Sequence, residues 1–69
     1  MALHNKIREC RFFANEMTQQ ELATAVGVTR QTIMAIEKGK YSPSLEVAFK
    51  VAAVFGKNLD EVFWYTPDS

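Results

Sequence analysis

Three hydrogen-bonding side chains, Arg30, Gln31 and Thr32, stand together near the start of VTRQTIMAIEKGK, residues 28–40. A Gln amide can pair with N6 and N7 of adenine, and an Arg guanidinium can pair with O6 and N7 of guanine. A helix fits the major groove of DNA, and its N-terminal residues contact the bases. The positive end of the helix dipole also favours a nearby phosphate. The segment therefore predicts base recognition by Arg30 and Gln31, against the alternative that both are ordinary solvated residues.

Apolar residues occupy the opposite face of this predicted helix. Ile33 and Ile36 recur at the three-residue spacing of a helix face, so we expect them to anchor the segment on a core. Gly27 and Val28 leave only a short link to the preceding helical pattern, and two helices joined so tightly must cross at a steep angle. Packing of the isoleucine side then leaves the first turn of the segment, at Arg30, projecting outward.

Local start and stop signals divide the chain into five helices. The first is marked by the spacing of Ile7 and Cys10. Each later helix follows a residue whose side chain can accept a hydrogen bond from an amide of the first turn. Glu21 and Glu61 stand three residues after two of these caps, which is the pattern of a capping box. The expected N-caps are Thr18, Thr29, Ser44 and Asn58, and the expected helix-ending glycines are Gly27, Gly39 and Gly56.

The fourth helix and the tail complete the prediction of an all-α fold. The fourth helix should bury one face, whereas residues 64–69, WYTPDS, are too short for a helix and contain Pro67. Trp64 and Tyr65 favour extended backbone, so we expect five helices and a short extended tail. The expected buried face of the fourth helix consists of Leu45, Ala48, Val51, Ala52 and Phe55.

Aromatic side chains are numerous for so short a chain. A domain of this size buries only about 60% of its unfolded surface, and oligomerisation is a common remedy. We expect most of the aromatic side chains, including Phe12, Phe13 and Phe49, to lie in the core. The best candidates for an apolar patch that a second subunit closes are Phe63, Trp64 and Tyr65.

Charge is unevenly distributed along the chain, although the net charge is zero. Zero net charge argues mildly against a nucleic-acid partner, because phosphate contacts need an excess of Lys and Arg. Residues 30–40, however, carry three cations and one acid, whereas Asp60, Glu61 and Asp68 stand in the last part of the chain without a cation. The chain is therefore basic in its middle and acidic at its end.

The residue inventory argues against an enzyme, a metal site and a membrane protein. His4 and Cys10 provide no set of nucleophile, base and orienting group, so we expect no catalytic residue, no cofactor and no metal. His4 is expected on the surface and Cys10 in the core. A single cysteine fits a reducing compartment, so we expect a cytoplasmic protein. There is no apolar run of about 18 residues that would span a membrane, and the charged start MALHNKIRE does not fit a signal peptide.

A more specific pattern runs through residues 18–56. It places small residues, polar residues and isoleucines at fixed positions in the two central helices, and an Ile-Arg-Glu triplet precedes it at 7–9. The segment GKYSPSLEVAFKVAAVFG, residues 39–56, continues it. The positions that carry it are Gln19, Ala23, Gly27, Ile33, Ile36, Glu37 and Gly39.

With these residues the chain resembles the Xre/Cro/CI-type helix-turn-helix repressors, and especially their small, stand-alone members. The resemblance implies a single five-helix domain of the lambda-repressor type over residues 1–69, with the helix-turn-helix at 18–38 and a tail at 64–69 that can pair with the N-terminus as a small β-sheet. It also implies a homodimer that binds double-stranded DNA at a palindromic operator and regulates transcription. Occupation of promoter DNA would make it a repressor, and activation is the alternative.

The resemblance also assigns roles to individual positions. It implies that Glu37 pairs internally and that the loop after the third helix holds the DNA backbone. Lys38 and Lys40 are alternatively solvated cations beside a helix end, and Tyr41 alternatively covers the loop. The implied base-reading residues are Arg30, Gln31, Thr32 and Met34, and the implied phosphate-binding residues are Gln19, Thr29, Lys38, Lys40, Tyr41 and Ser42.

The chain departs from the family pattern at two places. Residues 11–17, RFFANEM, contain one residue more than the usual link between the first two helices, which leaves a DNA contact by Arg11 undecided. Met34 stands where a polar residue, often Asn, is frequent. A thioether donates no hydrogen bond, so contact with a thymine methyl group suits Met34 better.

A second class of function stays compatible with the sequence. The acidic and aromatic residues 58–69 fit a protein-interaction module, such as an antitoxin or an adaptor that binds a protein partner through this tail. A pull-down with and without residues 58–69 separates the hypotheses. Loss of a protein partner with DNA binding intact would support a mixed role, and the absence of any partner would remove the interaction module.

Overall fold

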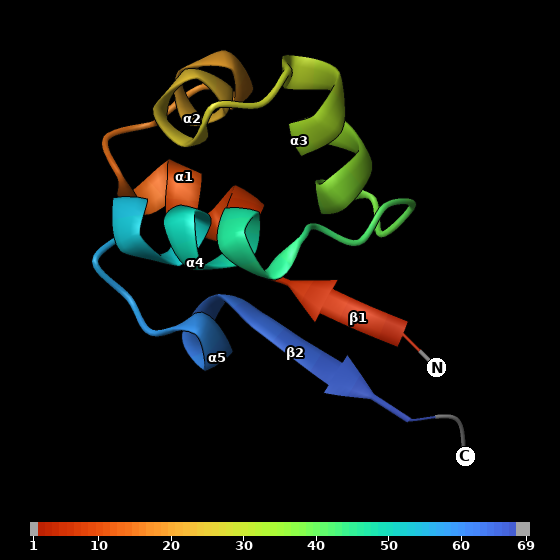
Figure 1. The fold of residues 1–69 in the computed structure, drawn as a ribbon. Helices are drawn as coiled ribbons and strands as arrows, with labels where there is room; N and C mark the ends of the chain where they lie inside the picture. The colour runs from red at the N-terminus through yellow and green to blue at the C-terminus, as the bar shows by residue number, and fades with distance from the viewer. Residues whose placement is uncertain (1, 68–69) are drawn as a thin grey trace.

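A computed structural model describes residues 2–67 as five helices and two short strands (Figure 1). The five expected helices and the expected pairing of the tail with the N-terminus are confirmed, whereas residues 68 and 69 of the expected tail lie outside the described residues. None of the helices in the described part is long and apolar enough to cross a membrane. The elements are β1 Ala2–Asn5, α1 Ile7–Phe13, α2 Gln19–Val26, α3 Arg30–Glu37, α4 Leu45–Val54, α5 Leu59–Val62 and β2 Phe63–Thr66.

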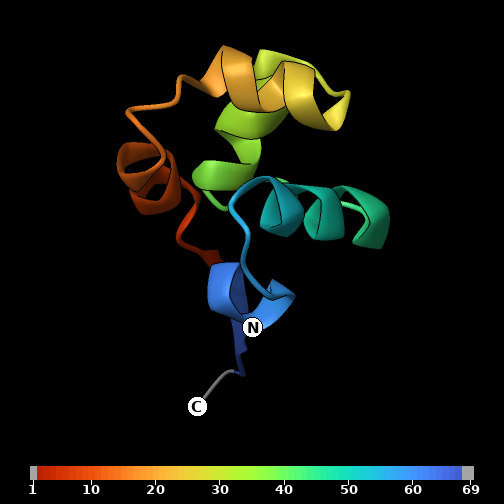
Figure 2. The ribbon, with the colours of Figure 1, turned by 90° about the vertical axis from the view of Figure 1, so that its left-hand side faces the viewer.

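The two strands form an antiparallel sheet at one end of the molecule, and α2 and α3 lie at the other (Figure 1). The register pairs His4 with Trp64 and Asn5 with Phe63. A view turned by 90° also shows α2 at the end opposite the sheet (Figure 2), whereas the last turn of α3 reaches β1, where the Asn5 side chain donates to the Ile36 carbonyl. The corner between α2 and α3 and the paired ends of the chain therefore occupy different ends of the fold.

The expected caps start the helices. The Thr18 hydroxyl accepts from the Glu21 amide at 3.0 Å, and the Glu21 carboxylate accepts from the Thr18 amide at 2.8 Å, so the capping box is present. The Glu61 carboxylate likewise accepts from the Asn58 amide at 2.8 Å. The Thr29 and Ser44 hydroxyls each accept from the amide three residues on, at 3.2 Å. These short-range bonds explain why the helix starts follow from the local sequence.

The core is formed by side chains from all five helices and from β2. Ile33 and Ile36 of α3 are buried in it, as expected, and Cys10 of α1 is the expected core thiol. Burial of both isoleucines fixes the rotation of α3 about its axis. The buried residues are Ile7, Cys10, Leu22, Ala23, Val26, Ile33, Ile36, Ala48, Val51, Ala52, Val62 and Phe63.

The expectation that most aromatic residues lie in the core is wrong. Phe12, Phe13 and Phe49 are all more than half exposed. Phe13 is 82% exposed because it is the last residue of α1, and the chain turns away there. Phe63, in contrast, is only 6% exposed, because successive side chains of a strand point to opposite faces and Phe63 points inward. Of the three residues expected on an apolar patch, Trp64 and Tyr65 are therefore exposed and Phe63 is a core residue.

The expected buried face of α4 is confirmed only in part. Ala48, Val51 and Ala52 are buried, and Phe55, just after the helix, is half-buried. Leu45 is 67% exposed, so its assignment to the buried face is wrong. It is the first residue of α4 and stands at the rim of a hollow between α4 and β2, where the described residues leave it uncovered.

Candidate nucleic-acid interface

A tight corner sets the angle between α2 and α3. Gly27 adopts the left-handed conformation, with φ of +78°, and the amides of Gly27 and Val28 both donate to the Ala23 carbonyl. A left-handed residue costs glycine least, because it has no Cβ atom. Ala23 is fully buried between the packed helices, as expected from its small side chain. The corner therefore holds α3 firmly against α2 by its buried side.

The first turn of α3 projects away from the core. Arg30 and Gln31 are exposed, whereas Thr32 and Met34 are half-buried. The Thr29 hydroxyl accepts from the Thr32 amide, and the two hydroxyls lie 2.9 Å apart. Arg30 and Met34 share a face because residues four apart on a helix are neighbours. The structure thus brings the four expected base-reading residues onto the free end and one side of a single helix.

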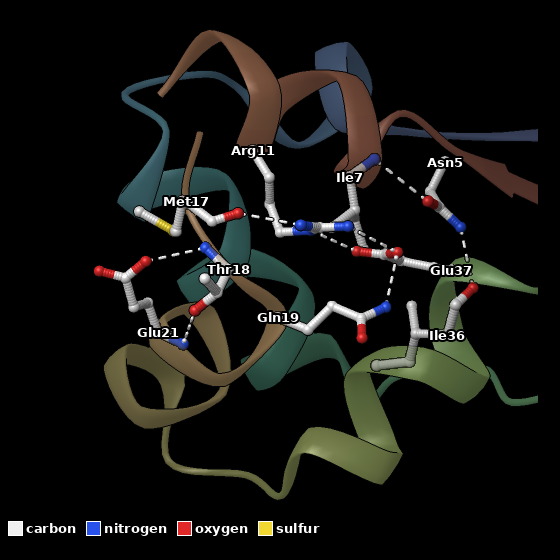
Figure 3. Close-up of polar contacts among 9 residues, drawn as sticks. All are labelled: Asn5, Ile7, Arg11, Met17, Thr18, Gln19, Glu21, Ile36 and Glu37. Atoms are coloured by element: carbon white, nitrogen blue, oxygen red, sulfur yellow. Dashed lines mark hydrogen bonds and ion pairs between the residues drawn. The ribbon is translucent and has the colours of Figure 1, made fainter. Parts of the chain in front are cut away.

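A partly buried network joins the last turn of α3 to α1 and to the start of α2 (Figure 3). The Glu37 carboxylate accepts from Nε and Nη2 of Arg11 at 2.7 and 3.1 Å, and from Nε2 of Gln19 at 3.1 Å. Arg11 also donates to the Met17 carbonyl at 2.9 Å. The side chains of Arg11 and Glu37 are only 16% and 10% exposed. The expected internal pairing of Glu37 is confirmed, and Arg11 is its partner rather than a free cation.

This network orients the side chain of Gln19 at the first position of α2. Its amide nitrogen has two hydrogens, of which one is donated to Glu37, so the other is available to a ligand. The extra residue in the link after the first helix left the role of Arg11 undecided from the sequence. Its partner Glu37 is 26 positions away, and no spacing rule relates residues so far apart. The α2 terminus therefore presents a donor whose direction is fixed by α1 and α3.

The loop after α3 leaves the helix through a Schellman motif. Gly39 is left-handed, with φ of +74°, the Gly39 amide donates to Ile36 and the Lys40 amide donates to Ala35. Lys38, Lys40, Tyr41 and Ser42 are all exposed. Flexible ammonium groups and hydroxyls in this position can donate hydrogen bonds to phosphate oxygens. Cationic groups consequently stand at both ends of α3, with Arg30 at one end and Lys38 and Lys40 at the other.

A comparison with models of protein families identifies the family to which the chain belongs. Residues 7–62 match the helix-turn-helix family model HTH_3. The chain belongs to the Xre-type helix-turn-helix family. It is accordingly a transcriptional regulator with a helix-turn-helix DNA-binding domain, and it belongs to a family that is not enzymatic.

Similar proteins occur in archaea and bacteria. An HTH-type transcriptional regulator of Methanocaldococcus jannaschii, MJ0272, is 50% identical over 66 residues, which are 96% of this chain and 98% of the relative. The HTH-type regulator YgzD of Bacillus subtilis is 45% identical over 90% of this chain and 92% of its own length. The transcriptional repressor RstR of cryptic phage CTXphi, from Vibrio cholerae, is 38% identical over 84% of this chain and 51% of its own length.

A solved structure shows the same fold. It is the clp gene regulator ClgR from Corynebacterium glutamicum, which superposes with a TM-score of 0.71 at 25% identity. The match covers 80% of this Xre-type chain and 57% of that chain. Together with the relatives, it favours the regulator over the protein-interaction module that the tail alone suggested.

Proposed function

We propose that this Xre-type protein binds double-stranded DNA sequence-specifically, reads the major groove with α3 and represses transcription as a homodimer. The observation that carries the proposal is the asymmetry of α3. Arg30 and Gln31 are exposed on its first turn, whereas Ile33 and Ile36 fix its other side in the core. A helix held in this way enters the groove with its N-terminal side chains first.

Base contacts in this proposal come from four residues of α3. The Arg30 guanidinium and the Gln31 amide have the donors and acceptors for guanine and adenine. Met34, half-buried one turn further on, contacts a thymine methyl group, and the Thr32 hydroxyl, which lies 2.9 Å from that of Thr29, contacts a base at the start of the helix. Phosphate contacts position the protein and come from both ends of α3 and from the start of α2. They are assigned to Gln19, Thr29, Lys38, Lys40, Tyr41 and Ser42.

The proposed dimer forms through the end of the molecule opposite α2 and α3. Trp64 and Tyr65 border a hollow of about 620 Å³ between α4 and β2, and the exposed Leu45 and Phe49 border it too. An exposed apolar surface of this kind typically marks an interface. In the proposal residues 1–69 act as one domain, and a two-fold axis at this hollow presents two α3 helices to successive major grooves about 34 Å apart.

Repression follows in this proposal from occupation of promoter DNA. A symmetric dimer selects a palindromic operator, because each half-site meets the same helix. The similarity to RstR supports the direction of the effect, since that relative is named a transcriptional repressor.

Selection of bound duplexes from a random pool tests the proposal. The expected result is a palindrome whose half-sites lie one helical turn apart. Arg30→Ala or Gln31→Ala should then cost roughly 1–3 kcal/mol at one base position, while Lys40→Ala should weaken binding to all sequences alike. Lys50→Ala, which removes an exposed cation of α4, is the matched control. It should change neither the base preference nor the affinity for duplexes of other sequence. The proposal fails if the protein shows no salt-dependent preference for any duplex.

A further inference from the structure

A hollow of about 360 Å³ lies between α1 and α3, on the side where Gln19 opens α2. Its floor is the Arg11–Glu37–Gln19 network, which is partly buried and already hydrogen-bonded. Its wall on the α3 side includes Met34, which the proposed function places against a base. The hollow is lined by Arg8, Arg11, Gln19, Met34, Glu37 and Lys38.

The lining of this hollow is positively charged. Three cations and one carboxylate line it, and the carboxylate of Glu37 is already paired with Arg11. The charges of Arg8 and Lys38 therefore remain uncompensated among the lining residues. Both side chains are exposed, so their heads are accessible to an anion.

The two arginines of α1 differ in what they bind. They lie three residues apart and so share a face of the helix. Arg11 is turned inward and donates to Glu37 and to the Met17 carbonyl. Arg8 is exposed, and among residues 2–67 the structure records no carboxylate paired with it. The inner arginine holds the helices together, and the outer one offers its guanidinium to a ligand.

We propose that Arg8, together with Lys38, binds a backbone phosphate of DNA in this hollow. The inference rests on the proposed function, to which it adds a contact made by α1, outside the helix-turn-helix. A guanidinium suits the task because its planar set of donors can bind two phosphate oxygens at once. Lys38 supplies a second point charge from the end of α3. The contact fixes the distance between α1 and the DNA backbone while α3 lies in the groove.

Salt dependence of binding measures this contact, on a duplex of the sequence recovered by the selection above. The logarithm of the association constant falls linearly with the logarithm of the salt concentration. Arg8→Ala should make this slope less steep by about 0.9 per subunit, which is the value for one lost phosphate contact. Arg8→Lys keeps the charge and should retain the slope of the unmodified protein. Lys57→Ala is the matched control, because it removes an exposed cation that lines a different hollow, beside Cys10, and it should leave the slope unchanged.

A neutral methylphosphonate at each backbone position in turn locates the contact. The unmodified protein should lose affinity at several positions of each half-site, because several residues are proposed to bind phosphates. At the one position that Arg8 and Lys38 share, Arg8→Ala should lose less affinity than the unmodified protein does, and its losses at the other positions should be unchanged. An Arg8→Ala protein that is folded in a thermal melt, but keeps the full slope or the full sensitivity at every position, overturns the inference while the proposed function stands. A selection that recovers no preferred duplex overturns the proposed function itself.

Discussion

Glu37 is the residue whose charge is least expected near a DNA-binding surface, and the structure explains why it is tolerated. Its carboxylate accepts from two nitrogens of Arg11 and from Gln19, and it is only 10% exposed. The negative charge is thereby compensated inside the domain. Glu37 thus joins the last turn of α3 to α1 and to the start of α2.

Replacement of Arg11 by Met should destabilise the protein by about 3 kcal/mol, because it leaves the Glu37 carboxylate partly buried without its partner. The free energy of unfolding from urea denaturation measures the effect. Lys50→Met is the control, since the Lys50–Glu46 pair is exposed, and it should change the stability by less than about 0.5 kcal/mol. Equal effects of the two substitutions would show that the Arg11–Glu37 pair contributes no more than a surface pair.

Two successive residues of the link between α1 and α2 have left-handed backbones without being glycine. Asn15 has φ of +61° and Glu16 has φ of +56°. Glu16→Gly should stabilise the protein by about 0.5–1 kcal/mol, because a Cβ atom disfavours this conformation. Asn15→Gly is the matched control with a smaller gain, since Asn tolerates the region better. Thermal unfolding measures the stability of both variants. A loss of stability in Glu16→Gly would show that the left-handed backbone at Glu16 is not strained.

The thiol of Cys10 should react slowly in the folded protein. Burial raises the pKa of this thiol above its ordinary value, against an opposing effect of the Lys57 charge. A raised pKa lowers the fraction of thiolate, which is the reactive form, at any pH below it. At pH 8 the reaction with a disulfide reagent such as DTNB should therefore be much slower than in urea, and its rate should rise with pH. Equal rates in folded and unfolded protein would contradict this.

At the scale of whole elements, the helix starts could be predicted because their signals are local. The Thr18–Glu21 bonds and the Thr29–Thr32 bond each span three residues, so the sequence contains both partners side by side. The corner at Gly27 could be predicted for the same reason, since one left-handed residue determines it.

What could not be predicted depends on contacts between distant elements. The periodicity of α1 and α4 does not reveal which neighbours cover a residue at a helix end, so Phe13 and Leu45 were wrongly assigned to the core. The partner of Glu37 lies 26 residues away, and only packing of α1 beside α3 brings the two together. The base-reading and phosphate-binding roles came from side-chain chemistry and family resemblance, and they stay predictions.

Asn5 connects three elements through one side chain. Its amide nitrogen donates to the Ile36 carbonyl at 2.9 Å, and its side-chain oxygen accepts from the Ile7 amide at 3.1 Å (Figure 3). Asn5→Ala should cost about 1–2 kcal/mol, because both backbone groups lose a partly buried partner. Gln20→Ala, which removes an exposed bond to Thr24, is the control and should cost far less. Urea denaturation of both variants measures the difference, and equal costs would contradict the connecting role.

At the scale of the whole molecule, the first turn of α3 lies apart from the exposed aromatic residues of β2. The corner between α2 and α3, from which Arg30 projects, lies at one end, whereas β2, which carries Trp64 and Tyr65, lies at the other (Figure 1). A dimer formed through the sheet end leaves both helix-turn-helix units free. The excess of cations among residues 30–40 explains how a chain of zero net charge can present a cationic surface to DNA.

Leu45→Glu should separate the proposed dimer into monomers. Because the dimer is symmetric, its interface contains the substituted residue once from each subunit. Burial of two unpaired carboxylates is costly, so the dissociation constant of the dimer should rise by about 100-fold or more. Analytical ultracentrifugation of the full chain measures it. Because Leu45 is 67% exposed in the single chain, the substitution leaves the core intact.

Phe13→Glu provides the matched control for Leu45→Glu, since Phe13 is even more exposed but borders a different hollow, beside Cys10. It should leave the sedimentation of the dimer unchanged. If both variants dissociate, any added negative charge weakens the dimer and the hollow between α4 and β2 is not its interface. If neither does, the dimer forms elsewhere or does not form. Selective dissociation by Leu45→Glu should be accompanied by weaker operator binding, because a monomer engages one half-site and loses the advantage of two linked contacts.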